Sequence, residues 1–391
     1  MKKNTAELSP SHWINLALVP PAAVSFYGAL RNVFRGGHFQ DFQWSGAHLA
    51  FRHIDPYHQA LIHDPNHYIL LTQAPNYLHE LYLLLLPFGA LSFHAAEPYW
   101  TLMNCLFTAI SVLMLRQIYN LDRSRTILIA LLLLISTPFR IALGAGTEAL
   151  LELLLFCLVF HCASLVGSGI ATGLSYFKYS FSPVLFLYFF FTKRYKLLAI
   201  SLLPPLLGLL LMWLLVHGNL FTLAIEPFLV SRISVAPGLG DLMTVLHYIF
   251  DKTFSKTGDL AYAAIATSAG YAFYLSRHRE LSPQRAAAAI AVASLMFFTH
   301  LTHDYVLLVI PLAACVAGPL SRAKVLVLSA IGIIWYGVKI VPMFGYSYAV
   351  LTTTSIIVFS LLAAVLVLLG QLDAPLPARE MQLSAETAAT Q

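Results

Sequence analysis

The sequence predicts an all-α polytopic membrane protein, and three observations support this. Hydrophobic residues make up 59% of the chain and charged residues only 10%, with a mean hydropathy of +0.74, whereas soluble domains carry about 25% charged residues. The apolar runs are long and do not alternate, which favours helical spans over barrel strands. Much of the polar chemistry is concentrated in one stretch, residues 34–76.

The first span is expected at residues 13–30, where the chain turns apolar after a short polar N-terminus. Lys2 and Lys3 precede this span and should stay in the cytoplasm under the positive-inside rule. The long loop that follows, residues 31–76, therefore falls outside. No cleavable signal peptide is expected.

The apolar run at residues 77–93 is ambiguous, because His79, Glu80 and Pro87 make it a poor span. If it crossed the membrane, every later basic turn would fall outside. We therefore interpret it as a helix that lies in, or re-enters, the outer interface, which keeps those turns cytoplasmic. The basic turns contain Arg123, Arg125, Lys193, Arg194, Lys196, Arg277, Arg279, Arg322 and Lys324.

The rest of the chain predicts about twelve spans in one transmembrane domain, residues 1–370. A run at residues 170–191 is too short for two full spans, so we expect a hairpin of two short helices there. The polar tail 371–391 is expected to be cytoplasmic and disordered. The further spans are expected at 98–119, 126–141, 150–166, 197–216, 260–275, 286–298, 305–316, 325–341 and 348–369.

The first external loop should contain amphipathic helices that lie at the membrane interface. Residues 41–52 have helical spacing, with Phe42, Leu49 and Trp44 placed to lie on the membrane surface. Asp55-Pro56 should end this segment, because proline disfavours a helical residue before it.

Two loop aspartates are candidates for chemistry. Asp41 directly follows the first span and is either a helix N-cap or a catalytic carboxylate at the outer interface. Asp55 begins Asp55-Pro56-Tyr57, which is equally well explained as a turn. The aromatic residues Trp44, Tyr57 and Tyr77 lie in or beside the same loop and are further candidates to contact a ligand.

Neither a metal nor another cofactor is expected. Six histidines lie in the loop, but only His63 and His67 have the close spacing of a zinc site. The four cysteines lie in apolar runs and are predicted to be core residues. The net charge of +5 is carried by short turns and serves topology, so no nucleic-acid partner is expected.

Ionisable residues inside or at the ends of spans are informative because each is costly unless it is paired or used. Glu148 and Glu152 lie one helical turn apart and should face the bundle interior. Lys178 lies within the short hairpin and is expected either to pair with one of these glutamates or to bind an anionic phosphate. Arg140 is expected at the outer face.

A further polar motif, His300-Leu301-Thr302-His303-Asp304-Tyr305, lies at the external end of a late span. It is explained either by Asp304 opening a helix or by His300 and His303 binding a phosphate. On the expected topology, Lys178 and at least one of these histidines approach the same outward cavity as Asp41.

Several of these motifs, taken in order, resemble glycosyltransferase family 87. They are Gln40-Asp41-Phe42, Asp55-Pro56-Tyr57, Ala74-Pro75-Asn76 before an apolar run, Gly146-Thr147-Glu148, the 173–183 segment with Lys178, and 300–305. The resemblance covers roughly residues 31–311 and includes the polyprenyl-phosphate-mannose-dependent mannosyltransferases of the cell envelope.

The resemblance implies the C-type glycosyltransferase fold in the inner cell membrane, with the active site facing the periplasm or exterior. It also implies that the catalytic aspartate lies in the first external loop, that a polyprenyl-phosphate sugar enters from the outer leaflet, and that the anomeric carbon is inverted. The acceptor would be a lipid or glycan, and membrane lipids would surround the protein.

The chemistry fits the residues independently, because inverting transfer needs one general base for the acceptor hydroxyl. Asp41 would be that base. A phosphate leaving group needs charge stabilisation more than protonation, which Lys178, Arg140, His300 and His303 could supply. The alternative is a transporter or flippase of lipid-linked sugars, for which repeats in matching halves would be expected. A non-catalytic assembly subunit is the third possibility.

Overall fold

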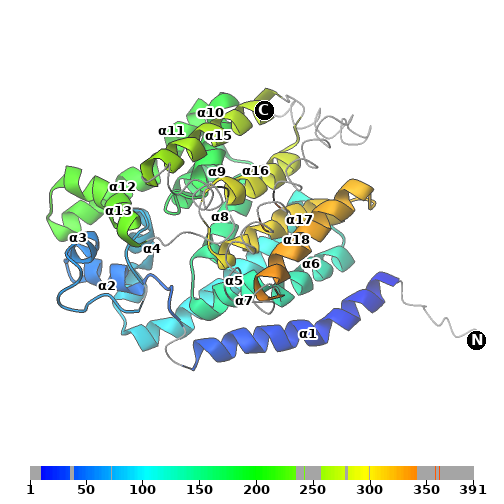
Figure 1. The fold of residues 1–391 in the computed structure, drawn as a ribbon, viewed down its shortest axis with the longest axis horizontal. Helices are drawn as coiled ribbons and strands as arrows, with labels where there is room; N and C mark the ends of the chain where they lie inside the picture. The colour runs from blue at the N-terminus through cyan, green and yellow to red at the C-terminus, as the bar shows by residue number, and fades with distance from the viewer. Residues whose placement is uncertain are drawn as a thin grey trace, which may run out of the picture.

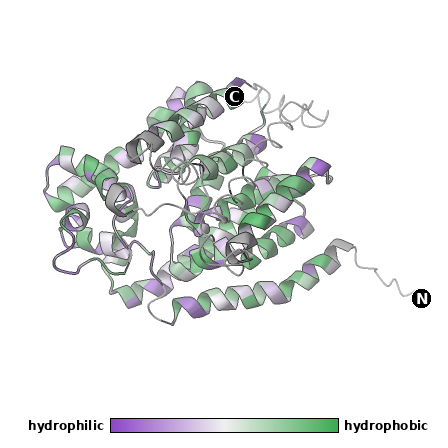
Figure 2. Ribbon diagram, viewed as in Figure 1, coloured by the Kyte–Doolittle hydropathy of each residue, from purple (hydrophilic) through white to green (hydrophobic). Residues whose placement is uncertain are grey.

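The computed structural model describes residues 10–35, 39–71, 73–234, 242, 257–277, 281–298, 300–340, 357 and 361. Within these residues the protein is 78% helical and has no strand, as the sequence predicted. Figure 1 shows the longer helices running across the view, with α2, α3, α12 and α13 gathered at the left end. The helices are mostly hydrophobic, and polar segments lie chiefly in the connections and at helix ends (Figure 2).

Among the described residues, three helical segments are long and apolar enough to cross a membrane: Trp13–Val33, Phe93–Ile118 and Tyr195–Val216. A fourth is added if α6 (Arg123–Ile135) and α7 (Thr137–Ala145) form one bent span. Their axes differ by 63° at Ser136. The break follows from Pro138, which has no N–H to donate to the Leu134 carbonyl and whose ring would clash with that carbonyl in a continuous helix. The Ser136 hydroxyl caps the new helix by accepting a hydrogen bond from the Phe139 N–H at 3.3 Å.

The N-terminal half contains the longest helices. α1 continues through Pro20 and Pro21 without a break between described residues, and Figure 1 shows it along one edge of the molecule. The expected interfacial helix is α4, whose 11 residues are too few to cross a membrane. The bounds of these helices are α1 (Pro10–Val33), α2 (Trp44–Phe51), α3 (Pro56–Leu61), α4 (His79–Gly89) and α5 (Phe93–Ile118).

The middle of the chain contains shorter helices. The two short helices expected at residues 170–191 are α9 and α10, although α9 begins earlier than predicted, at Leu165. Each is roughly 15 Å long at 1.5 Å per residue. Each helix is therefore about half as long as a full transmembrane span. The helices are α8 (Ala149–His161), α9 (Leu165–Ser175), α10 (Ser182–Phe191), α11 (Tyr195–Ser201), α12 (Leu203–Val216) and α13 (Leu220–Ser234).

The C-terminal part continues the helical bundle. α16 is almost entirely buried and packs against α15 and α17. The span expected at 348–369 and the tail 371–391 lie outside the described residues, apart from residues 357 and 361, which are buried. The helices are α15 (Thr257–Arg277), α16 (Pro283–Phe297), the 3₁₀ helix η1 (Thr302–Leu308), α17 (Val309–Val316) and α18 (Arg322–Ile340).

Hydrogen bonds between distant segments define one end of the bundle, where basic turns lie. The Asn15 amide donates to the Ser124 carbonyl at 3.0 Å, and the Arg125 guanidinium donates to the Ala317 carbonyl at 3.0 Å. The Tyr119 hydroxyl donates to the Gln284 carbonyl at 3.0 Å. The start of α1, the α5–α6 turn and the end of α17 therefore meet at this end of the bundle.

In the loop of residues 31–76, which we expect to be external, helix α2 is packed against the protein, which corrects the expectation that this helix lies on the membrane surface. Phe42 and Leu49 are fully buried, and Trp44 is 6% exposed. α2 packs against α4, where the backbones approach so closely that a Cβ on Gly89 would lie 2.6 Å from the Ala47 carbonyl. The apolar face of α2 is therefore covered by protein rather than by lipid.

Candidate functional site

Asp41 lies in a turn before α2, close to the junction of α7 and α8. Its N–H donates to the Ala145 carbonyl at 3.0 Å. Gly146, which follows Ala145, has a φ of +71° and lies directly against the Phe39 ring, so that a Cβ there would be 2.3 Å from a ring carbon. Glycine meets both conditions at once. The Asp41 side chain is 24% exposed.

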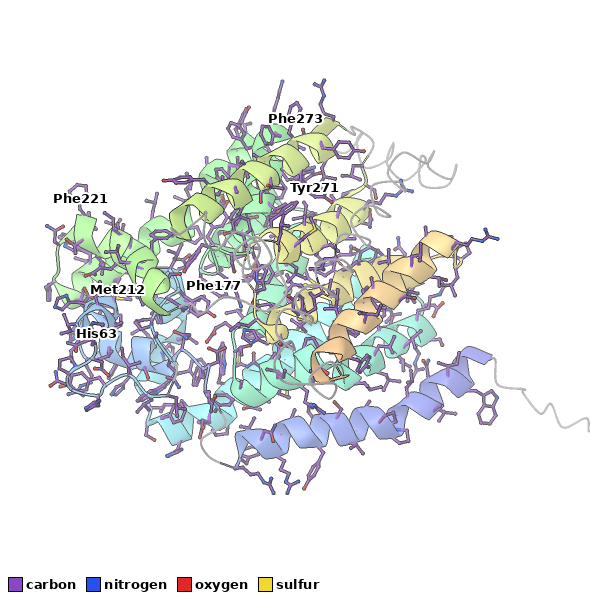
Figure 3. The ribbon with its side chains drawn as sticks, in the orientation of Figure 1. His63, Phe177, Met212, Phe221, Tyr271 and Phe273 are labelled. Carbon is purple, nitrogen blue, oxygen red and sulfur yellow. The ribbon has the colours of Figure 1, made fainter. Side chains whose placement is uncertain are left out.

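Lys178 lies in the turn between α9 and α10, and it is 5% exposed. Its ammonium forms an ion pair with Asp304 and lies 5.9 Å from the Tyr77 ring centroid. Phe177, the residue before Lys178, anchors this turn, because its carbonyl accepts a hydrogen bond from the Leu78 N–H at 3.2 Å. Figure 3 shows Phe177 in the middle of the molecule, whereas Phe221 projects at its left edge.

Asp304 lies at the start of η1 and is the centre of the polar cluster. Its carboxylate receives Lys178, and it also accepts hydrogen bonds from the His300 ring and the Leu301 N–H, both at 3.2 Å. His303 Nε2 lies 3.4 Å from Asp304 Oδ1, the oxygen that Lys178 also contacts. Asp304 is 3% exposed, so these contacts are made away from water.

His300 is placed between two hydrogen-bond acceptors. Its Nδ1 faces the Asp304 carboxylate at 3.2 Å, and its Nε2 faces the Ser294 carbonyl at 2.9 Å. Both ring nitrogens of His300 therefore have an acceptor within hydrogen-bond distance, which fixes the orientation of the ring beside Asp304.

His303 connects this buried cluster to Asp41. Its Nε2 lies 3.7 Å from the Asp41 carboxylate, which is an electrostatic contact longer than a hydrogen bond. A continuous series of charged and polar groups thus runs from Lys178 through Asp304 and His303 to Asp41. The Asp41 side chain is far more exposed than the other three, so it is the member placed to meet a reactant.

Two glutamates complete the cluster. Glu148 is fully buried at the start of α8, and its Oε1 accepts a hydrogen bond from the Gln43 N–H at 3.0 Å. Glu152 lies one turn later and is 1% exposed. Both face the bundle interior as the sequence predicted, but the alternative in which Lys178 pairs with one of them is wrong. Lys178 forms its ion pair with Asp304 instead.

The alternative interpretation of Asp41 as a helix cap is also corrected. The N-cap residue of α2 is Gln43, and Asp41 lies two residues before it. Asp304 does act at a helix start, since its carboxylate accepts the Leu301 N–H, although its principal partners are the side chains of the cluster. Arg140 is half-buried in α7, and α7 packs against η1.

The other predicted site residues lie in structural positions elsewhere in the loop. Trp44 donates from its indole nitrogen to the Phe88 and Leu91 carbonyls, both at 3.1 Å. Asp55 is the N-cap of α3, and its side chain accepts from the Tyr57 N–H at 3.0 Å. Tyr57 is fully buried and donates from its hydroxyl to the Tyr77 carbonyl at 2.9 Å.

A second acidic cluster lies around Tyr57, where α3 and α4 meet α12 and α13. Burial raises the pKa of Glu80 to about 8. Burial, followed by the neighbouring Asp55 carboxylate, raises the pKa of Glu226 to about 7. Burial also lowers the pKa of His79 to about 4, and its ring bonds to the Leu223 carbonyl at 3.0 Å.

Histidines of the loop region contact main-chain carbonyls near helix ends. His48 Nδ1 lies 2.7 Å from the Gly89 carbonyl at the end of α4. His53 Nδ1 lies 2.8 Å from the Leu215 carbonyl near the end of α12. Both contacts attach the loop to neighbouring helices by satisfying carbonyls that lack a partner within the helix.

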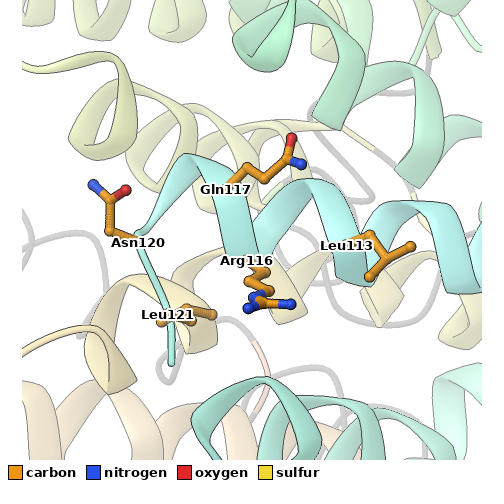
Figure 4. Close-up of a pocket in the computed structure, with 5 residues that line it drawn as sticks. All are labelled: Leu113, Arg116, Gln117, Asn120 and Leu121. Carbon is orange, nitrogen blue, oxygen red and sulfur yellow. The ribbon is translucent and has the colours of Figure 1, made fainter. Parts of the chain in front are cut away.

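A surface hollow lies at the C-terminal end of α5 (Figure 4). Trp100, on the same helix, contacts the Asp41 region by donating to the Gly146 carbonyl at 2.8 Å. Asn120 in the hollow is about 30 Å further along, at 1.5 Å per residue, so the hollow belongs to the opposite end of the bundle. It is lined by Leu113, Arg116, Gln117, Asn120 and Leu121.

Sequence reasoning missed two features of the site. It treated Asp304 only as a helix cap. An acidic residue next to His303, in a chain that also contains Lys178 within a short apolar hairpin, was a signal for a charge partner. It gave no role to Gln43, whose backbone N–H holds Glu148. A main-chain contact of this kind has no signature in residue type.

Comparisons of the chain with models of protein families, with curated proteins and with solved structures found no match. The resemblance to glycosyltransferase family 87 therefore rests on its motifs alone.

Proposed function

We propose that the protein is an integral-membrane glycosyltransferase with the C-type fold and about twelve transmembrane helices. It transfers a sugar, a mannose-like hexose or a pentose, from a polyprenyl phosphate to a lipid or glycan acceptor. The reaction takes place on the external face of the inner cell membrane and inverts the anomeric carbon.

One observation carries this proposal: Asp41 is a partly open carboxylate at the end of a buried, charged cluster. A general base must reach the proton of an acceptor hydroxyl, and so it needs access. It must also keep a fixed position, because misplacement by about 1 Å can cost a hundredfold in rate. Asp41 has both properties, since its N–H is bonded to Ala145 and His303 lies beside its carboxylate.

In the proposed reaction Asp41 takes the proton from the acceptor hydroxyl. The acceptor oxygen forms a bond to the anomeric carbon on the face opposite the phosphate. The bond between that carbon and the phosphate oxygen breaks, and its electron pair leaves with the lipid phosphate. Protonated Asp41 then returns its proton to water.

His303, Asp304 and Lys178 act as positioning residues in this scheme. Asp304 is held by Lys178 and His300, and it in turn lies beside His303. Because these four side chains are each 5% exposed or less, water does not screen their charges. Lys178 is occupied by Asp304, so direct binding of the lipid phosphate at Lys178 would require this pair to open.

The assay that tests the function uses purified protein and a panel of radiolabelled polyprenyl-phosphate sugars, with thin-layer separation of the products. Transfer with release of lipid phosphate supports the proposal. A transporter or flippase is the second candidate, because the 63° break between α6 and α7 and the half-length α9 and α10 resemble broken transporter helices. Movement of the lipid-linked sugar across vesicles without chemical transfer would favour that candidate instead.

A further inference from the structure

The hollow at the C-terminal end of α5 is open to the surface and is lined mainly by polar side chains. Its volume is about 560 Å³. Leu113, Arg116 and Gln117 have i, i+3, i+4 spacing and so share one face of the last turns of α5, while Asn120 and Leu121 follow in the turn after the helix (Figure 4). The three polar side chains are exposed. The hollow therefore presents hydrogen-bond donors to a ligand that approaches from the surface.

Arg116 is the cation of the hollow, and it is free to bind a ligand. Within the described residues its guanidinium has neither an ion pair nor a hydrogen-bond partner. Arg125 nearby is occupied, because it donates to the Ala317 carbonyl and pairs with Asp122 at 3.5 Å. The same pair compensates Asp122, the acid that directly follows the hollow in sequence. Since arginine stays charged at physiological pH, the hollow attracts an anion.

An exposed apolar stripe on α5 leads into the hollow. The helix is one of those long and apolar enough to cross a membrane. The stripe is about 16 Å long at 1.5 Å per residue, which is close to half of the roughly 30 Å hydrocarbon core of a bilayer. It therefore matches one leaflet, and Arg116 follows it where the headgroups begin. Its residues are each between 40% and 57% exposed: Leu102, Leu106, Ile110 and Leu113.

We propose that the hollow binds the anionic headgroup of a membrane phospholipid and that an acyl chain of the same lipid lies along the stripe. The Arg116 guanidinium pairs with the phosphate through two parallel N–H groups, the geometry that arginine favours. The amides of Gln117 and Asn120 donate to the remaining headgroup oxygens. Binding changes no covalent bond.

The stripe and the openness of the hollow favour a lipid over a soluble anion. A small anion at Arg116 would stay in contact with water and salt, which screen an exposed charge pair. A lipid adds the burial of apolar area along α5. Basic pockets at the ends of transmembrane helices bind anionic headgroups in this way. The site is independent of sugar transfer, because Trp100 and the Asp41 region lie at the other end of α5.

The site is tested by photolabelling the purified full-length protein in detergent. The probe is a phosphatidylglycerol with a photoreactive diazirine in one acyl chain, and mass spectrometry of peptides locates the label. We expect the label on α5 between Leu102 and Leu113. Unlabelled dioleoyl phosphatidylglycerol should displace the probe at about fivefold lower concentration than dioleoyl phosphatidylcholine, which has no net charge.

Substitutions test the role of the arginine. Arg116→Gln should weaken binding of the probe about tenfold, because a charge-assisted hydrogen bond is lost. Arg116→Lys keeps the charge but not the paired N–H groups, so its affinity should lie between the two. Arg31→Gln is the matched control, because Arg31 is also an exposed arginine in the last turn of a span-length helix, α1, but lies outside the hollow. It should bind the probe within about twofold of the original protein.

Three results would overturn the inference. Label spread over the apolar surface without enrichment on α5 would show only non-specific contact with lipid. Unchanged affinity in a folded Arg116→Gln protein, verified by thermal unfolding, would show that Arg116 does not hold the headgroup. Displacement of the probe by glycerol 3-phosphate as effectively as by phosphatidylglycerol would show that the hollow binds a soluble anion. The two displacement measurements use the original protein, so they decide the question even if a variant fails to fold.

Discussion

Lys178 forms an ion pair with Asp304, which lies 126 residues further along the chain. The pair joins the α9–α10 turn to the start of η1, and both side chains are 5% exposed or less. Asp304 also contacts His303, which lies beside Asp41. The pair therefore determines where the histidine closest to the proposed base is held.

Removing either partner of this pair should strongly destabilise the protein. Lys178→Met or Asp304→Asn would each leave a buried charge without its partner, and we expect a loss of about 3–5 kcal/mol. The double variant should recover part of this loss. Thermal unfolding in detergent measures all three. Asp122→Asn is the control for an exposed pair with Arg125, and it should change stability by less than about 1 kcal/mol.

His303 should affect the chemical step rather than donor affinity. We expect His303→Ala to lower kcat about tenfold to a hundredfold, because Asp41 loses the group that positions it, with little change in KM for the donor. Added imidazole should restore part of the rate. His94→Ala, which removes an exposed ring paired with Glu97, is the control and should leave kcat unchanged. A rise in KM with kcat unchanged would contradict a positioning role.

The second acidic cluster predicts how stability depends on pH. Burial raises the pKa of Glu80 to about 8 and that of Glu226 to about 7, from an ordinary value of 4.5. Because the folded protein holds these protons more tightly than the unfolded chain, stability should fall as the pH rises from about 4.5 to 8. Melting curves across this range measure the slope. Glu80→Gln should make the curve flatter, and an unchanged slope would contradict the assignment.

The membrane orientation is tested by cysteine labelling at two positions in a chain whose native cysteines are replaced. Ser124, at the end of the bundle with the basic turns, should be labelled only after the membrane is opened. Asn66, exposed in the first loop, should be labelled by an impermeant reagent added to intact cells. Labelling of Ser124 from outside would overturn the proposed topology.

The sequence was sufficient to predict the all-helical class and the approximate positions of many helices. Low charge and long apolar runs predicted helices, and the short run at residues 170–191 predicted α9 and α10. The structure also brings Lys178, His303 and Asp41 into one cluster, as the alternation of helix ends led us to expect. Such predictions work because hydropathy is a local property of the sequence, and because successive helices run in opposite directions, so that their ends alternate between the two sides of the bundle.

The errors arose where tertiary contacts decide the outcome. The spacing of Phe42 and Leu49 predicts an apolar face, but it cannot show whether lipid or α4 covers that face. The choice of Asp304 over Glu148 or Glu152 as the partner of Lys178 depends on how the α9–α10 turn meets η1. That relation between distant segments has no local signal.

Sugar transfer by an Asp41→Asn variant tests the central claim most directly. Asparagine keeps the size of aspartate but cannot take the acceptor proton, so transfer from a radiolabelled polyprenyl-phosphate sugar should fall about a hundredfold or more. Asp64→Asn is the matched control, since Asp64 is a loop carboxylate that accepts the Tyr68 and Ile69 N–H groups, and asparagine can replace it there. It should keep nearly full activity. A well-folded Asp41→Asn protein with near-normal transfer would contradict the account.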